Sequence, residues 1–194
     1  MTFRQVAQRI RVPAGFVLAP LLFISARPTI ASLAAGAFVA IIGLGIRAWA
    51  SGHLRKNQEL TISGPYAHTR NPLYLGTFLL GTGLALGGGT LWFMVLFAAL
   101  YLLIYVPVMV AEADTMRDLF AEEYQRYSSE VPLFVPRFSP YGVHSSSSYA
   151  AQFKRSSWRG GRAFDPSLYL RHREYRAALG FVLCYAMLVT KMFL

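Results

Sequence analysis

One uninterrupted apolar run, Tyr74 to Val110, constrains the fold of this chain more than any other feature. Its 37 residues include no Lys, Arg, Asp, Glu or His, whereas one crossing of a hydrocarbon core takes about 20 residues. Three consecutive glycines, Gly87 to Gly89, stand near its middle with Thr90 after them, and they predict a tight turn. The run therefore predicts two membrane-spanning helices joined as a hairpin.

Three further apolar runs extend this pattern: Val12 to Ala26, Ile30 to Ile46 and Ala177 to Leu194. We expect an all-α integral membrane protein with about five transmembrane helices, at about residues 12–26, 30–50, 72–88, 91–110 and 176–194. A signal peptide is an alternative for the first run, because three arginines precede an apolar core of suitable length. The next run begins just after Arg27 and Pro28, which fits a helical hairpin better than a cleavage site.

The composition also favours a membrane protein, because 55% of the residues are hydrophobic and only 14% are charged, against about 25% charged in a typical soluble domain. The net charge of +10 would fit nucleic-acid binding as well. With the N-terminus inside, however, 17 of the 19 Lys and Arg residues lie on the cytoplasmic side, leaving Arg27 and Lys191 outside. This asymmetry follows the positive-inside rule and explains the charge without a nucleic acid. All nine acidic residues also fall inside, so if this protein carries out chemistry, we expect its active site at the cytoplasmic face. We expect a multi-pass protein of the bacterial inner membrane.

We expect the chain to divide into a membrane core over residues 1–138, a basic cytoplasmic segment over 139–175 and a C-terminal transmembrane helix over 176–194. Basic residues alternate with aromatic ones between Phe153 and Arg176, a pattern that fits an anionic lipid surface. The single cysteine, Cys184, excludes an intramolecular disulfide and a cysteine-rich zinc site, and we expect no metal.

Small residues recur four positions apart within the expected spans. The pairs are Gly36 with Ala40, Thr77 with Gly81, and Gly83 with Gly87. This spacing lets helix backbones approach closely in lipid, so we expect it to serve helix packing.

The loop before the third span carries turn and helix-start signals. Ser63–Pro65 predicts a turn, and Asn71–Pro72 predicts an N-cap followed by a proline in the first turn. We expect His53 and His68 to be solvated loop histidines rather than bases. The prolines of Val131–Pro136 keep that apolar stretch extended, and we expect it to fold back on the membrane or over a pocket.

A charged segment, residues 112–127, follows the fourth span. Its apolar residues recur at helical spacing with charges on the other face, which predicts one amphipathic helix; they are Met116, Leu119, Phe120, Tyr124 and Tyr127. Glu112 lies within two residues of the apolar span, where a carboxylate without a partner is costly. Either Glu112 reaches water at the helix end, or it has a partner in a binding site.

Three motifs occur in order within about residues 45–138. They are Gly64-Pro65-Tyr66, then Arg70-Asn71-Pro72-Leu73-Tyr74-Leu75-Gly76, then Glu112 followed by the stretch Phe120 to Tyr127 and the apolar segment after it. Together they resemble the integral-membrane methyltransferases, which include isoprenylcysteine carboxyl methyltransferases and phosphatidylethanolamine N-methyltransferases. The resemblance implies S-adenosylmethionine as the cofactor, held at the cytoplasmic ends of the helices. It does not extend to the segment from about residue 139 onward.

The resemblance implies that Arg70 and Glu112 are the catalytic residues. Glu112 suits the ammonium group of the cofactor, and Arg70 suits its carboxylate or a substrate anion. The resemblance implies that five residues line the cofactor site: Leu60, Tyr66, Pro72, Tyr74 and Glu112. We also expect Gln58, Thr61, Asn71 and Leu73, which lie in the same two stretches of the loop, to bind the cofactor. Because a sulfonium group is already activated, such an enzyme mainly aligns the reactants and excludes water.

Three positions depart from the isoprenylcysteine branch. Gln58 and Asn71 stand where that branch has histidines, and Val108 stands where it has an arginine for its substrate. Asn71 to Tyr74 with Gly76 resembles the phospholipid branch instead. We therefore expect a lipid-like or small hydrophobic methyl acceptor that enters from the membrane.

Two alternatives stay open. Membrane sterol reductases use a similar Arg-x-Pro-x-Tyr motif with NADPH, although with Asn directly after the proline, where this chain has Leu73. The second alternative is a small membrane protein without enzymatic activity, although spans two to four carry no buried charge for a transport path.

Overall fold

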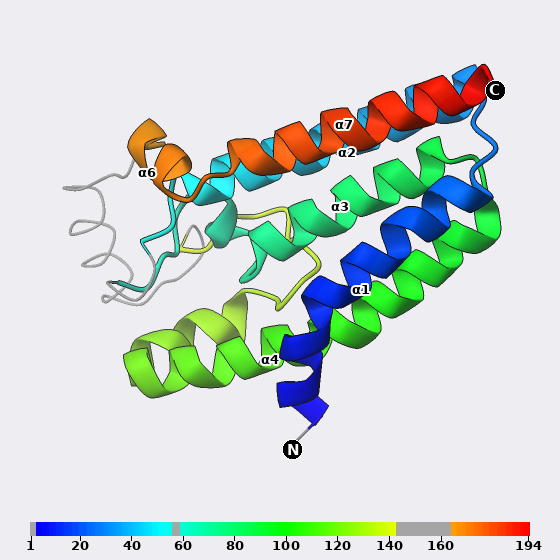
Figure 1. Ribbon diagram of the computed structural model, residues 1–194. Helices are drawn as coiled ribbons and strands as arrows, with labels where there is room; N and C mark the ends of the chain where they lie inside the picture. The colour runs from blue at the N-terminus through cyan, green and yellow to red at the C-terminus, as the bar shows by residue number, and fades with distance from the viewer. Residues whose placement is uncertain (1–2, 56–58, 143–163) are drawn as a thin grey trace. The chain divides into compact units, whose positions relative to one another are not determined.

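A computed structural model describes residues 3–55, 59–142 and 164–194, and every regular element in these ranges is helical (Figure 1). The elements are α1 (Phe3–Ser25), α2 (Ile30–Ser51), the 3-10 helix η1 (Gly64–Ala67), α3 (Pro72–Gly87), α4 (Leu91–Glu130), α6 (Pro166–Arg171) and α7 (Tyr175–Met192). The all-α prediction is thus confirmed for the described residues.

The apolar helices coincide with the predicted spans. By length and composition, α2, α4 and α7 could each cross a membrane, and Pro13–Ser25 and α3 are shorter apolar helices. Large apolar side chains on these helices are exposed, as in Phe16, Val95 and Leu183, and exposed apolar surface of this extent is unusual in a soluble monomer. A multi-pass membrane protein accounts for both features.

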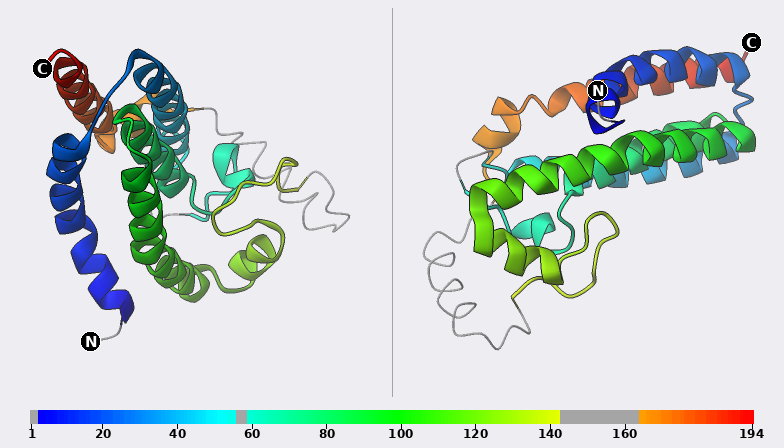
Figure 2. Two further views of the ribbon diagram at one scale, coloured as in Figure 1. Left: turned by 90° about the vertical axis from the view of Figure 1, so that its right-hand side faces the viewer. Right: turned by 90° about the horizontal axis from the view of Figure 1, so that it is seen from below.

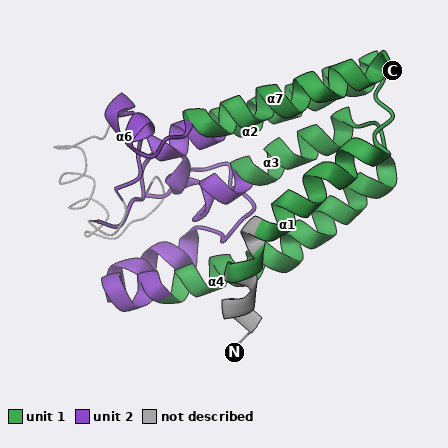
Figure 3. Ribbon diagram, viewed as in Figure 1, with its two compact units in different colours: residues 1–45, 76–114, 175–194 green, residues 46–75, 115–174 purple. Residues whose placement is uncertain are grey.

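The chain divides into two compact units, which are described separately (Figure 3). Unit 1 comprises residues 1–45, 76–114 and 175–194, and unit 2 comprises residues 46–75 and 115–174. The boundaries predicted from the sequence, near residues 138 and 175, stay a prediction.

In unit 1, α2 and α3 approach each other through small residues. A Cβ atom added at Gly83 would lie 2.5 Å from the carbonyl oxygen of Gly36 and 2.6 Å from the amide nitrogen of Ala40. A Cβ atom at Gly43 would lie 2.6 Å from the carbonyl oxygen of Gly76. Real Cβ atoms do not come so close to backbone, so only glycine fits, and the predicted packing role of the Gly36, Ala40 and Gly83 positions is confirmed.

The hairpin between α3 and α4 also follows the prediction. α3 ends at Gly87 and α4 begins at Leu91, while Gly89 has φ +68°, a conformation that favours glycine. The α1–α2 connection contacts this turn, because Arg27 N–H donates to the carbonyl oxygen of Gly88 at 2.8 Å. Thr90 Oγ1 also donates to the carbonyl oxygen of Ser25 at 3.0 Å.

The helix α7, which lies beyond the motifs of the resemblance, packs within unit 1. Leu188 of α7 is buried against Ala26 and Leu33. The ammonium group of Lys191 donates to the carbonyl oxygens of Phe23 and Ile24, the latter at 2.9 Å. These carbonyls lie at the C-terminus of α1, where a cation is favourable. Lys191 thus anchors the end of α7 to the end of α1.

The segment after the fourth span differs from the prediction of one amphipathic helix. α4 continues without interruption from the span to Phe120 and then turns sharply at Ala121, which has φ 38° and ψ −113° (Figure 2). Beyond the turn, Tyr124 and Tyr127 are buried, whereas Leu119 before it is 55% exposed. The five apolar residues therefore do not share one face. Helical spacing places residues on one face only if the helix is straight, and the break at Ala121 removes that condition.

Candidate functional site

Most residues that the sequence assigns to the site lie in unit 2. The half-buried ones are Leu60, Thr61, Arg70, Asn71, Leu73 and Tyr74, whereas Tyr66 and Pro72 are buried. Gln58 lies outside the described residues. Glu112 belongs to unit 1, where it is exposed on α4. Its predicted grouping with Arg70 and Tyr74 stays a prediction.

The first motif forms η1, which begins at Gly64 with φ +59°. A Cβ atom at this position would lie 2.8 Å from the ring of His53, so glycine is required both by conformation and by space. His53 is only 8% exposed, and its Nδ1 lies 2.9 Å from the carbonyl oxygen of Trp49. The expectation of a solvated histidine is therefore wrong for His53, which is a buried packing residue.

The segment from the end of η1 to the first residue of the second motif is paired along its backbone with the chain that follows α4. The Arg70 N–H donates to the carbonyl oxygen of Pro132 at 3.0 Å, and Arg137 N–H donates to that of His68 at 2.9 Å. Tyr141 N–H donates to the carbonyl oxygen of Ala67 at 2.9 Å. We call residues 66–71 together with 131–141 the motif seam. The apolar, proline-containing stretch therefore lies along residues 66–71 of unit 2, which we call the motif loop.

Side chains complete the motif seam. Thr69 is buried, and its hydroxyl donates to the carbonyl oxygen of Phe134 at 3.0 Å. Asn71 Nδ2 donates to the carbonyl oxygen of Leu133 at 2.9 Å, so this side chain fixes the loop as well as standing before α3. His68 is half-buried, and its Nδ1 lies 2.8 Å from the carbonyl oxygen of Arg137. The role of Thr69 was not predicted; its signal is a short polar side chain two residues before a helix-start Asn-Pro pair.

Two tyrosines beyond the Ala121 turn contact the motif loop. The Tyr127 hydroxyl donates to the carbonyl oxygen of Tyr66 at 2.7 Å. Burial raises the pKa of Tyr127 above its ordinary value, and the neighbouring Tyr66 and Tyr124 add to the rise. The hydroxyl therefore stays protonated and remains a donor throughout the physiological range.

Tyr124 accepts a hydrogen bond from Arg70, but it does not satisfy all the donors of the guanidinium group. One terminal nitrogen of Arg70 donates to the Tyr124 hydroxyl at 3.1 Å, and the guanidinium carbon lies 5.9 Å from the centre of that ring. The Nε atom of Arg70 is buried and has no hydrogen-bond partner among the residues that the structure describes. A buried charged donor without an acceptor is costly. Arg70 therefore offers a ready donor edge to an anion such as a carboxylate.

The donor set of unit 2 suits such an anion better than a metal ion. Within residues 3–55, 59–142 and 164–194, no group of three or more His, Cys, Asp or Glu side chains is placed to hold a metal ion. The site instead offers the guanidinium of Arg70, with the Tyr124 phenol as the acceptor of one of its hydrogen bonds. This chemistry fits the carboxylate end of an amino-acid-like ligand.

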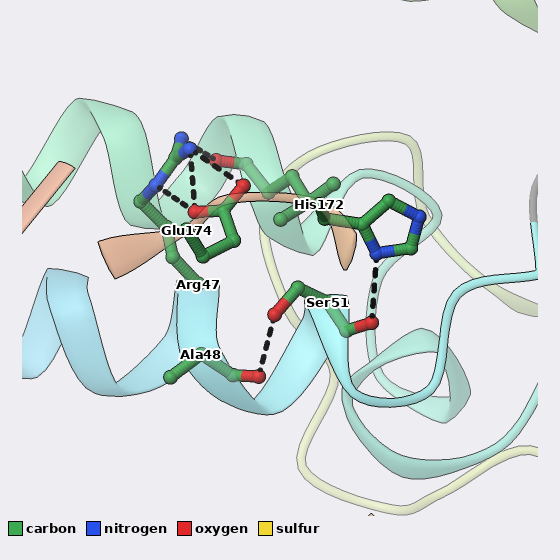
Figure 4. Close-up of polar contacts among 6 residues, drawn as sticks. Arg47, Ala48, Ser51, His172 and Glu174 are labelled. Carbon is green, nitrogen blue, oxygen red and sulfur yellow. Dashed lines mark hydrogen bonds and ion pairs between the residues drawn. The ribbon is translucent and has the colours of Figure 1, made fainter. Parts of the chain in front are cut away.

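A second polar cluster of unit 2 joins the end of α2 to the residues before α7 (Figure 4). Arg47 Nε and a terminal nitrogen contact the carboxylate of Glu174 at 3.0 and 2.7 Å. Another Arg47 nitrogen donates to the carbonyl oxygen of Leu73 at 3.4 Å. His172 Nδ1 lies 3.2 Å from the carbonyl oxygen of Ser51. No role was predicted for Arg47 or Glu174, because 127 residues separate them.

Comparison with known proteins gives one family and two named relatives. A family model described as phospholipid methyltransferase matches residues 22–123. The chain is similar to the cobalt-zinc-cadmium resistance protein CzcN of Cupriavidus metallidurans, with 32% identity over 157 residues, 75% of this chain and 71% of the relative. It is also similar to the nickel-cobalt-cadmium resistance protein NccN of Alcaligenes xylosoxydans xylosoxydans, with 29% identity over 113 residues, 57% of this chain and 51% of the relative. No solved structure matches the chain.

Proposed function

The chain belongs to the phospholipid methyltransferase family, and we propose that it transfers a methyl group from S-adenosylmethionine to a lipid-like or small membrane-soluble acceptor at the cytoplasmic face of the membrane. The observation that carries the proposal is the buried Nε of Arg70, which has no partner among the described residues. It lies in the motif that the family resemblance assigns to the cofactor. A carboxylate at this edge would supply the missing acceptor.

The residues present fit the cofactor by their charges. S-adenosylmethionine supplies an activated methyl group on a sulfonium and carries one carboxylate and one ammonium. Arg70 would hold the carboxylate, and Glu112 would hold the ammonium. Tyr66, Leu73 and Tyr74 would contact the remainder. The protein therefore needs to bind the cofactor and the acceptor, orient them and exclude water. It needs no nucleophilic side chain of its own.

The nature of residue 108 supports an apolar acceptor. Val108 is fully buried at the position where the isoprenylcysteine branch has an arginine for its substrate. A valine cannot bind a carboxylate, so a free carboxyl group on the acceptor has no anchor there. We therefore propose an acceptor that dissolves in the membrane and reaches the site laterally.

The two named relatives leave the acceptor open. Their names describe resistance to cobalt, zinc, cadmium and nickel and state no reaction. The proposal therefore rests on the family and on the Arg70 edge.

Ligand binding to the purified full chain in detergent tests the proposal. We expect S-adenosylmethionine and S-adenosylhomocysteine to bind, and NADPH not to bind, in isothermal calorimetry. Arg70→Gln should weaken the binding at least tenfold, since hydrogen bonds to charged groups are worth about 1.5–3 kcal/mol. Arg126→Gln is the matched control, because Arg126 is exposed and its ion pair with Glu122 is also exposed. NADPH binding instead would support a reductase, and binding of neither ligand would support a protein without this activity.

A further inference from the structure

The ion pair between Arg47 and Glu174 is well enclosed within unit 2. The two side chains are 20% and 11% exposed, and the guanidinium meets both carboxylate oxygens at 2.7–3.0 Å. A bidentate ion pair of this kind fixes the relative orientation of the two side chains as well as the distance between them. Exposed pairs contribute little, but removal of one partner of an enclosed pair leaves the other charge desolvated and unpaired.

The same arginine reaches the start of α3. A terminal nitrogen of Arg47 donates to the carbonyl oxygen of Leu73 at 3.4 Å. Leu73 stands between Pro72 and Tyr74, and these three residues carry part of the proposed cofactor contacts. Glu174 is therefore joined to the proposed site through one intermediate side chain, that of Arg47.

Glu174 is itself held in place by the segment that precedes it. Asp165 N–H donates to the carbonyl oxygen of Gly52 at 3.0 Å, and the ring of Phe164 lies so close to Gly52 that a Cβ atom there would clash with it. The other end of the segment is also anchored, because His172 Nδ1 lies 3.2 Å from the carbonyl oxygen of Ser51. Residues 164–174 thus contact the end of α2 at several points.

We propose that Glu174 is a positioning residue, which holds Arg47 against Leu73 and thereby sets the affinity of the first turn of α3 for S-adenosylmethionine. This inference rests on the proposed function. It also assigns a role to a residue beyond the range 22–123 that the family model matches. Without the carboxylate, the Arg47 guanidinium would turn toward water or another acceptor, and the Leu73 carbonyl would lose its side-chain donor.

Calorimetry with S-adenosylhomocysteine on the full chain in detergent tests this role. Glu174→Gln keeps the shape and removes the charge, and we expect the dissociation constant to rise about 3- to 30-fold, the range of indirect coupling between sites. Arg47→Lys, which keeps a positive charge and a donor, should lose less affinity than Arg47→Gln. Glu122→Gln is the matched control, since Glu122 also pairs with an arginine but is 84% exposed.

Hydrogen–deuterium exchange separates this inference from the proposed function. In the absence of ligand, the backbone amides of residues 71–77 should exchange faster in Glu174→Gln than in the wild type, and at the wild-type rate in Glu122→Gln. This result would support a positioning role of Glu174 for the start of α3. Unchanged exchange, or a rise of less than threefold in the dissociation constant of a folded variant, would overturn it. If the single variants do not fold, Arg47→Gln combined with Glu174→Gln leaves no unpaired charge, and wild-type affinity in that variant would overturn the inference. Failure of the wild type to bind S-adenosylhomocysteine would instead refute the proposed function.

Discussion

The hydroxyl group of Tyr127 donates a 2.7 Å hydrogen bond to the carbonyl oxygen of Tyr66, 61 residues earlier in the chain. Both tyrosines are buried. The bond joins the last turns of α4 to η1, the helix formed by the first motif. Together with the backbone pairs of the motif seam, it makes the geometry of the motif loop depend on the chain that follows the fourth span.

Removal of this bond should weaken the fold and change its response to alkali. Tyr127→Phe leaves the Tyr66 carbonyl without this donor, and we expect the free energy of unfolding to fall by about 1–3 kcal/mol. Because the folded pKa of Tyr127 is raised, the unfolded chain releases this proton first, near pH 10. The contribution is therefore complete below about pH 10 and lost as the pH rises above it.

Thermal unfolding in detergent between about pH 8 and pH 11 measures both effects. The Phe variant should have a lower midpoint at the start of this range and a shallower decline at its end than the wild type. Tyr175→Phe is the control, because Tyr175 is exposed. A Tyr127→Phe variant that follows the wild-type curve throughout would contradict the role of the bond.

The contrast between the spans and the motif loop shows what the sequence can predict. The apolar helices and the Gly87–Gly89 turn depend on local composition, and the structure has them where the pattern predicts them. The burial of Tyr124 and Tyr127 depends on a backward turn at Ala121, and an alanine with positive φ has no local signature. Only the tertiary fold stabilises such a conformation.

The site was predictable to a similar, limited degree. The motif resemblance proposes a residue range for the site, and the buried Nε of Arg70 has no partner among the described residues, which is compatible with its assigned role; the role itself stays a prediction. Asn71, predicted as a cofactor contact, donates its side-chain amide to the Leu133 carbonyl. The contribution of Glu174 could not be predicted, because its partner Arg47 lies far away in the sequence and no periodic pattern joins them.

Close packing of α2 against α3 should make Gly83 intolerant of any side chain. Gly83→Ala would place a methyl group 2.5 Å from the Gly36 carbonyl oxygen, so we expect a loss of about 1–3 kcal/mol from overpacking. Gly45→Ala is a matched control in α2, because nothing lies within 4 Å of its added Cβ. That change should be neutral or stabilising by up to about 1 kcal/mol. Equal unfolding midpoints for the two variants would refute the packing role.

The Tyr124 hydroxyl should matter for ligand affinity through Arg70. Tyr124→Phe keeps the ring beside the guanidinium and removes one hydrogen bond, worth about 1 kcal/mol, so we expect about fivefold weaker S-adenosylhomocysteine binding. The double variant Tyr124→Phe, Arg70→Gln should bind about as weakly as Arg70→Gln alone, because both changes remove the same contact. Additive losses in calorimetry would show that Tyr124 and Arg70 act independently.

The predicted orientation can be tested by cysteine labelling in a Cys184→Ser background. Leu91 and Ser129 are both exposed, and the charge asymmetry predicts that they lie on opposite sides of the membrane. A membrane-impermeant maleimide added to intact cells should label Leu91→Cys and not Ser129→Cys, with the reverse pattern in inverted vesicles. Reversed labelling would invert the topology and move the motif loop to the outer face.

Glu112 provides the sharpest test of how the cofactor is held. It lies on α4 just beyond the apolar span, where it is exposed, so a bound ammonium group competes with water for its carboxylate. Glu112→Gln keeps the shape and removes the charge. We expect S-adenosylhomocysteine to bind about tenfold more weakly, a loss of about 1.4 kcal/mol. This loss is near the lower end of the usual contribution of a hydrogen bond to a charged group, because Glu112 is exposed. Glu123→Gln on the same helix is the control, since Glu123 is also exposed and has no assigned role. If Glu112→Gln binds within threefold of the wild type while Arg70→Gln does not, Arg70 holds the cofactor carboxylate and Glu112 returns to the role of a solvated helix-end residue.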